Sequence, residues 1–151
     1  MSLKAQIEAD IKKAMLAKQK DELKALRAIK SMILLAETEK GADGAVSADA
    51  EMKLLMKAVK QRKDSATIYK EQGREDLYDI EMAEVAVIEK YLPQQLSEEE
   101  LKAELKKIIE KIGASGPQDM GKVMGMASKA FAGQADGKTI STIVKSILTG
   151  N

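Results

Sequence analysis

Apolar residues recur every three or four positions along most of the chain, which is the spacing of one face of an α-helix. No segment alternates apolar and polar residues long enough to indicate a strand, so no β-sheet is expected. The first helix is expected from about Leu3 to Lys18, behind a Ser2 cap. Its apolar face carries Leu3, Ile7, Ile11, Ala14 and Met15.

Three further helices are expected before Pro93. The second starts after Asp21 and ends at Gly41, where a glycine suits a left-handed cap. The third and fourth are expected over residues 47–72 and 74–92, separated by Gly73. Pro93 ends the fourth because a proline disfavours helical geometry in the residue before it. Residues expected on the core faces of these helices include Leu34, Val59, Ile80 and Ile88.

The pattern changes beyond Pro93, and residues 91–96 are interpreted as a hinge between two helical blocks. Ser97 and Glu100 have the spacing of a capping box at the start of the next helix, which Gly113 closes. Two shorter helices follow, roughly over residues 119–132 and 137–148. The sequence therefore predicts an all-α fold, with an N-terminal bundle of about four helices in residues 1–93 and a smaller three-helix domain in residues 94–151.

Composition narrows the possible chemistry. The chain has 151 residues, with 25 Lys plus Arg against 24 Asp plus Glu, no Cys and no His. Without thiolates or imidazoles, neither a metal site nor a cofactor is expected, and the net charge of +1 argues against a strongly basic nucleic-acid binder. The longest apolar stretch, Met32 to Ala36, is too short to cross a bilayer, and the N-terminus lacks the apolar run of a signal peptide. A soluble cytoplasmic protein is expected.

Three charged residues fall on predicted apolar faces. At 100° per residue, Arg62 lies within the apolar face of the third helix. Glu81 and Glu84 lie within that of the fourth. Because a charge removed from water needs a partner, Arg62 is expected to form a structural ion pair with Glu84 or Glu81. The functional alternative is that Arg62, together with Lys60 and Lys63, contacts phosphate.

Two segments near the C-terminus resemble each other. In each, an Asp precedes a Gly-Lys pair at the expected start of a helix: Asp119-Met120-Gly121-Lys122 and Asp136-Gly137-Lys138. Backbone amides at a helix start suit an anion. The alternative is structural, in which Asp caps the helix, Gly permits close helix packing and Lys is solvated. The candidate RNA- or anion-binding residues are Gly121, Lys122, Gly125, Lys129, Gly137, Lys138, Lys60 and Lys63.

Other signs of nucleotide chemistry are weak. The stretch from Gly116 to Val123 matches the glycine and lysine spacing of a P-loop, but Val123 stands where Ser or Thr must hold magnesium. A helix, not a strand, is expected before it, so nucleoside triphosphate binding is not expected. Phe131 is the only aromatic residue after Pro93 and lies on an apolar face, so it is interpreted as core rather than as a platform for stacking bases.

Several motifs in a fixed order give the chain a family resemblance. They are Lys60-Gln61-Arg62-Lys63-Asp64-Ser65, Tyr91-Leu92-Pro93 followed by Leu96-Ser97-Glu98-Glu99-Glu100-Leu101, Asp119-Met120-Gly121-Lys122-Val123-Met124-Gly125, and Gly133-Gln134-Ala135-Asp136-Gly137. Over essentially its whole length the chain resembles the YqeY-like proteins. That family is similar to the C-terminal tail domain of GatB, the B subunit of the glutamine-dependent amidotransferase that converts misacylated Glu-tRNA or Asp-tRNA to Gln-tRNA or Asn-tRNA.

The resemblance implies a helical bundle followed by a three-helix part, and a family label of carbon–nitrogen ligase with glutamine as amido-N-donor. The domains that perform amide transfer, use ATP and produce ammonia are not expected in this chain. Since the amidotransferase tail approaches tRNA, the implied partners are tRNA or another structured RNA, or a protein of tRNA amidation or translation. Gly125 and Lys129 match the tail's helix glycine and a basic position. Gln134 and Ala132 stand where the tail commonly has lysines, which removes about two phosphate contacts.

Three functions follow from these observations. The favoured one is a non-catalytic, RNA-associated helical protein that contacts RNA backbone through its C-terminal domain. The second is a protein-interaction module, in which nine Met and long helices offer an adaptable apolar groove. The third is an enzyme that uses carboxylates such as Glu81 and Glu84, which lie three positions apart on one helix face. No catalytic residue is expected, because no nucleophile is accompanied by an orienting base.

Overall fold

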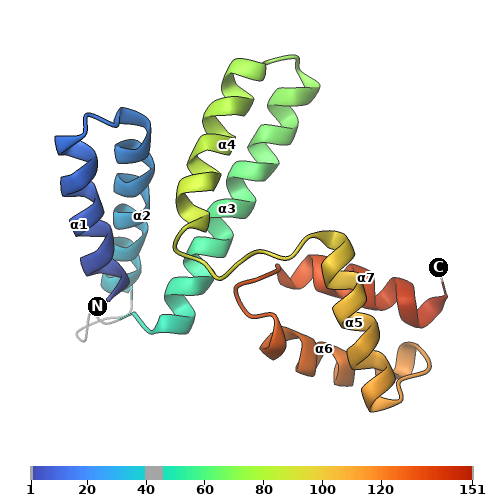
Figure 1. Ribbon diagram of the computed structural model, residues 1–151. Helices are drawn as coiled ribbons and strands as arrows, with labels where there is room; N and C mark the ends of the chain where they lie inside the picture. Colours follow the sequence, from blue (N-terminus) through green and yellow to red (C-terminus); the bar gives the residue numbers. More distant parts are fainter. Residues whose placement is uncertain (1, 40–45, 151) are drawn as a thin grey trace. The chain divides into compact units, whose positions relative to one another are not determined.

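The computed structural model describes residues 2–39 and 46–150, and every regular element within them is a helix (Figure 1). The elements follow in the order α1 (Leu3–Leu16), α2 (Lys20–Glu39), α3 (Ala48–Glu71), α4 (Glu75–Glu89), α5 (Glu98–Ile112), the short 3₁₀ helix η1 (Pro117–Asp119), α6 (Met120–Ala130) and α7 (Gly137–Thr149). The prediction of an all-α fold is confirmed. The expected cap at Gly41 lies outside the described residues. None of the described helices is long and apolar enough to span a membrane.

The chain divides into two compact units, an N-terminal unit that ends at Pro93 and a C-terminal unit that begins at Gln94. The N-terminal unit consists of two helical hairpins, α1 with α2 and α3 with α4 (Figure 1). Helix α2 also packs on α4. These contacts bury one stripe from each helix, and the side chains with no exposed surface are Ile7, Ala25, Leu26, Ala58 and Ile88.

Three residues expected in the core are instead exposed. Met15, Leu34 and Ile80 keep 54%, 39% and 48% of their surface accessible. On the helical wheel Met15 lies about 80° from the buried Ile7, Ile80 about 80° from the buried Ile88, and Leu34 about 80° from the buried Leu26. Spacing alone placed these residues on an apolar face, but a residue at the edge of that face meets solvent when the neighbouring helix covers only the centre.

The C-terminal unit is a three-helix arrangement in which α5, α6 and α7 contact one another in every pairing. Its core is built from one apolar stripe of each helix, and Leu105, Val123 and Val144 have no exposed surface. Phe131 is 7% exposed and belongs to the same cluster, as expected from its position on an apolar face. The unit therefore offers no aromatic ring to solvent among its described residues.

Helix starts and ends follow local sequence signals. The hydroxyl groups of Ser2, Ser47 and Ser97 each accept a hydrogen bond from the backbone amide three residues on, at 3.1–3.2 Å. The predicted caps at Ser2 and Ser97 are thus confirmed, and Ser47 is a third. At the other end, α3 and α5 close with Gly73 and Gly113 in the left-handed conformation, at φ of 72° and 68°. Both glycines end a helix where the sequence predicts a break.

Helix α1 ends in the same left-handed conformation without a glycine. Lys18 has a φ of 58°, its amide bonds to the Met15 carbonyl at 3.2 Å, and the Gln19 amide bonds to the Ala14 carbonyl at 2.9 Å. This pair of bonds defines a Schellman motif, whose left-handed position normally favours glycine. A side chain at that position crowds the backbone and costs free energy that a glycine avoids.

Replacing Lys18 with Gly should therefore raise the free energy of unfolding of the N-terminal unit by about 1 kcal/mol. Urea unfolding followed by tyrosine fluorescence measures it, since all three tyrosines lie before Pro93. The control is Ala17→Gly, one residue earlier in right-handed geometry, which should destabilise. An unchanged or lower midpoint for Lys18→Gly would show that the left-handed lysine carries no strain.

A half-buried phenol joins the first helix to the residues that follow the fourth. The Tyr91 hydroxyl donates to the Asp10 carboxylate at 2.5 Å. Burial, and then this hydrogen bond, raises the pKa of Tyr91 well above its ordinary value of 10. A phenol whose pKa is raised by folding contributes stability that is complete below the unfolded pKa and is lost as the pH rises through the folded pKa.

The N-terminal unit should therefore lose stability above about pH 10, and a Tyr91→Phe variant should lose less over the same range. Urea midpoints at about pH 8 and pH 11 measure the difference, and Tyr78→Phe serves as a control that retains the Asp10 contact. Parallel pH dependences for wild type and Tyr91→Phe would contradict a protonated Tyr91 that stabilises the fold.

Candidate functional site

The structure brings Arg62 and Glu84 together across α3 and α4. The Arg62 Nε donates to Glu84 Oε2 at 2.9 Å, and its Nη1 donates to the Ala58 carbonyl at 3.1 Å. Their side chains are only 16% and 13% exposed. Lys24 of α2 reaches the other Glu84 oxygen at 3.8 Å, so one carboxylate links three helices. Lys24 was not predicted as a partner, because, unlike Arg62 and Glu84, it does not fall on the apolar face of its helix.

Glu81, Lys60 and Lys63 take no part in the contact between Arg62 and Glu84. Glu81 makes no ion pair or side-chain hydrogen bond with any described residue, so Glu84 alone is the partner of Arg62. Lys60 pairs with Asp64 at 3.8 Å, and Lys63 pairs with Glu89 at 3.3 Å. Each cation of the string from Lys60 to Lys63 therefore already faces a carboxylate, which a phosphate would have to displace.

The candidate residues of α6 share one solvent-facing surface. At 100° per residue, Gly121, Lys122, Gly125 and Lys129 lie within about 100° of one another. All four are exposed, whereas Val123 on the far side of the helix is completely buried. We call the surface of Gly121, Lys122, Gly125 and Lys129 the α6 face.

The glycines of the α6 face are not required by packing. A Cβ atom added at Gly121 or Gly125 would meet no atom within 4 Å, and neither glycine has a left-handed backbone. The same is true of Gly137 at the start of α7. Close packing of helices, one part of the structural alternative, therefore does not explain these glycines within the C-terminal unit. Each glycine inside α6 costs the helix about 1 kcal/mol relative to Ala, with no packing gain within its own unit.

The two Gly-Lys helix starts differ in how their Asp is used. Asp136 caps α7, since its Oδ1 accepts the Thr139 amide at 2.7 Å and its Oδ2 accepts the Thr139 hydroxyl at 2.9 Å. Asp119 makes no such cap, because its carboxylate turns back to accept the Ser115 amide at 3.0 Å. The expected repeat is thus broken by η1, and the start of α7 already holds a carboxylate that opposes a second anion.

The lysines of α6 and α7 have no carboxylate partner. Neither helix contains an acidic residue. Among the described residues, no ion pair or hydrogen bond involves the ammonium group of any of the four, which are Lys122, Lys129, Lys138 and Lys145. They contrast with the cations of residues 60–63, which are all paired. Helices α6 and α7 therefore carry four positive charges and no negative charge among their own residues.

The described residues show no metal or P-loop geometry. No group of three or more acidic side chains is arranged to hold a metal ion. The segment from Gly116 to Val123 forms the η1 turn and the start of α6, with no strand before it. Its match to the spacing of a P-loop lacks the strand that would position the phosphates.

Most methionines serve the two cores rather than a groove. Met15 and Met126 are exposed, at 54% and 40%. The other described methionines pack partly buried against the two clusters, and they are Met32, Met52, Met56, Met82, Met120 and Met124. An adaptable methionine surface for a protein partner is therefore not favoured by the structure of either unit.

A family model described as Yqey-like protein matches residues 4–148. Curated relatives include a protein of the yeast Clavispora lusitaniae, 38% identical over 117 residues, a match that spans 76% of this chain and 66% of the relative. A protein of Pyrenophora tritici-repentis is 28% identical over 145 residues, spanning 94% of this chain and 78% of the relative. A third, from Meyerozyma guilliermondii, is 37% identical over 87 residues, spanning 57% of this chain and 44% of the relative. All three are named altered inheritance of mitochondria protein 41, mitochondrial.

These names contradict the expectation of a cytoplasmic protein, because the relatives are mitochondrial. The expectation rested on the absence of a long apolar run, which speaks only about insertion into a bilayer. Cytoplasm and the interior of a mitochondrion are both aqueous, so hydropathy does not distinguish them. The relatives' names mention neither RNA nor amide transfer.

Proposed function

Because this chain belongs to the YqeY-like family, we propose that it is a non-catalytic protein that associates with structured RNA, such as tRNA, through the C-terminal unit. The α6 face, with Lys138 beside it in sequence order at the start of α7, supplies the contact. The observation that carries the proposal is the set of four lysines on α6 and α7 without carboxylate partners. Unpaired lysines are the groups that phosphate contacts use.

The glycines of the α6 face support a close approach. With no side chain at Gly121 or Gly125, the helix backbone is uncovered at these two positions. A ribose–phosphate strand can lie nearer to such a surface than to one covered by side chains. The free energy that the two glycines cost the helix is then offset by the contact they permit.

The same features predict weak, sequence-independent binding. The only aromatic side chain of the unit, Phe131, is buried, so no base can stack on it. With about three or four lysine contacts, affinity should fall steeply as the salt concentration rises. The slope of log K against log salt concentration should be roughly −0.7 to −0.9 per contact. The contact reads RNA backbone and shape rather than bases.

A fluorescence titration of tRNA at two salt concentrations tests the lysines. The triple variant Lys122→Gln, Lys129→Gln, Lys138→Gln should lose about two to three phosphate contacts, which makes the salt slope correspondingly shallower. Its binding at low salt should be at least about tenfold weaker. The matched control is Lys60→Gln, Lys63→Gln, which removes lysines that are already paired. Equal, very weak binding by wild type and the triple variant would reject an RNA role.

A second test replaces a glycine of the α6 face, and the substitution should have opposite effects on stability and on RNA binding. Gly125→Ala should stabilise the free protein by about 1 kcal/mol, since Ala is the better helix former and open space surrounds the site. The same variant should bind tRNA several-fold more weakly, because its methyl group holds the strand away from the backbone. Unchanged tRNA affinity in a stabilised variant would show that RNA does not approach this part of α6.

A further inference from the structure

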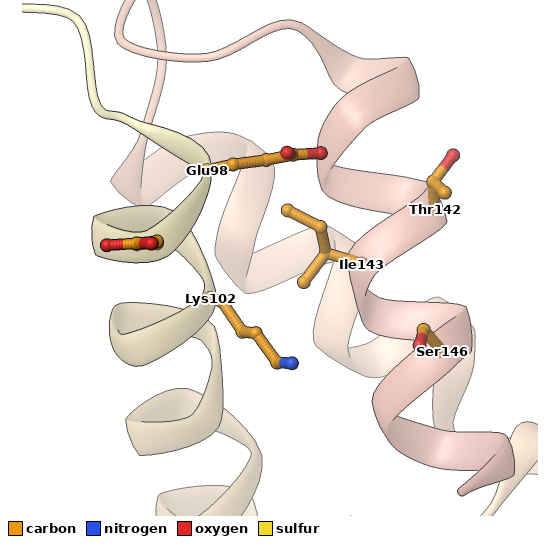
Figure 2. A pocket seen from close by; sticks show the side chains of 6 residues that line it. Glu98, Lys102, Thr142, Ile143 and Ser146 are labelled. Atoms are coloured by element: carbon orange, nitrogen blue, oxygen red, sulfur yellow. The ribbon is translucent and has the colours of Figure 1, made fainter. Parts of the chain in front are cut away.

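A groove unrelated to the α6 face lies between the first turns of α5 and the outer side of α7 (Figure 2). It encloses about 340 Å³, at the lower end of the size range of small-molecule sites. Its lining consists of three charged side chains from α5, two hydroxyl side chains and one apolar side chain from α7: Glu98, Glu99, Lys102, Thr142, Ser146 and Ile143.

The charges of this groove are not paired with each other. Glu98 and Lys102 are four positions apart with the acid first, the arrangement that usually favours an ion pair on a helix. Among the described residues, however, neither one forms an ion pair. Figure 2 shows both side chains directed from α5 toward α7, with Ile143 between them. A negative and a positive group therefore lie on either side of an apolar surface.

This combination selects among ligand classes. Two carboxylates and one ammonium give the lining a net charge of −1, which disfavours phosphates and nucleotides. A simple cation would meet Lys102 as well as the acids. A ligand with one cationic and one anionic group satisfies both signs, and an apolar substituent on it covers Ile143.

We propose that the groove binds a free α-amino acid with an apolar side chain. Its ammonium group pairs with Glu98, with Glu99 adding negative potential, and its carboxylate pairs with Lys102. Its side chain lies against Ile143. Since all three charged residues are exposed, each pairing contributes little, and the dissociation constant is expected in the millimolar range.

Leucine and two analogues test the proposal by NMR titration of the protein. Leucinamide lacks the carboxylate, and 4-methylpentanoate lacks the ammonium group. Leucine should shift the Ile143 methyl and Thr142 amide signals to saturation at about 20 mM, and each analogue should bind several-fold more weakly. Lys102→Gln should abolish the preference for leucine over leucinamide, and Glu98→Gln the preference over 4-methylpentanoate.

Lys106→Gln and Glu110→Gln, on α5 but outside the lining, are the matched controls and should retain both preferences. Absence of shifts at these signals, or equal affinity for leucine and both analogues, would overturn the proposal. Loss of tRNA binding in the lysine variants of α6 and α7 does not affect this outcome, since the groove contains none of those residues.

Discussion

Leu105→Ala should unfold the C-terminal unit while the helices before Pro93 stay folded. Leu105 of α5 has no exposed surface and belongs to the core that α5 shares with α6 and α7, so its truncation leaves a cavity and costs about 2–5 kcal/mol. A unit of this size rarely gains more than about 3–5 kcal/mol from its single core. The loss therefore approaches the whole stability of the unit.

The two units can be followed separately. Tyrosine fluorescence reports only the N-terminal unit, and the methyl signals of Val123 and Ile140 report the core of the C-terminal unit. Leu105→Ala should abolish the native methyl shifts and leave the tyrosine transition unchanged, and the exposed control Lys106→Ala should alter neither. If the tyrosine transition moves with the methyl signals, the two units unfold as one.

Local signals predicted the helix ends best. Ser2, Ser47 and Ser97 cap helices, and Gly73 and Gly113 close them, because these short-range interactions depend on few residues. Lys18 could not be predicted, since a left-handed lysine is chosen against local preference by the hairpin that α1 makes with α2. Tertiary contacts decide such a position, and one sequence does not display them.

The sequence predicted which residues belong to the candidate surface, but not why glycines stand there. Gly121, Lys122, Gly125 and Lys129 were among the candidate residues named from the sequence, and the structure places all four on one exposed face. The sequence could not show that both glycines face open space, because a glycine needed for helix packing and a glycine exposed to solvent are the same letter in a sequence. Nor could it show that Asp119 bonds to Ser115, since a 3₁₀ turn replaces the expected cap.

Glu84→Leu should lower the free energy of unfolding of the N-terminal unit by about 2–3 kcal/mol. The change removes the partner of Arg62 at 2.9 Å and the carboxylate that Lys24 approaches, and it leaves a guanidinium that is only 16% exposed. Removal of one member of a fully buried pair costs about 3–5 kcal/mol, and partial exposure here reduces that figure. Urea unfolding followed by tyrosine fluorescence measures the loss.

The double variant Arg62→Met, Glu84→Leu should recover most of this loss, because two apolar side chains leave no buried charge unpaired. Glu89→Leu is the matched control: it breaks the Lys63 pair between the same two helices, where the side chains are 51% and 31% exposed, and should cost no more than about 1 kcal/mol. A double variant less stable than Glu84→Leu would contradict a purely structural ion pair. Arg62 would then stabilise the unit through its bond to the Ala58 carbonyl at 3.1 Å, independently of the carboxylate.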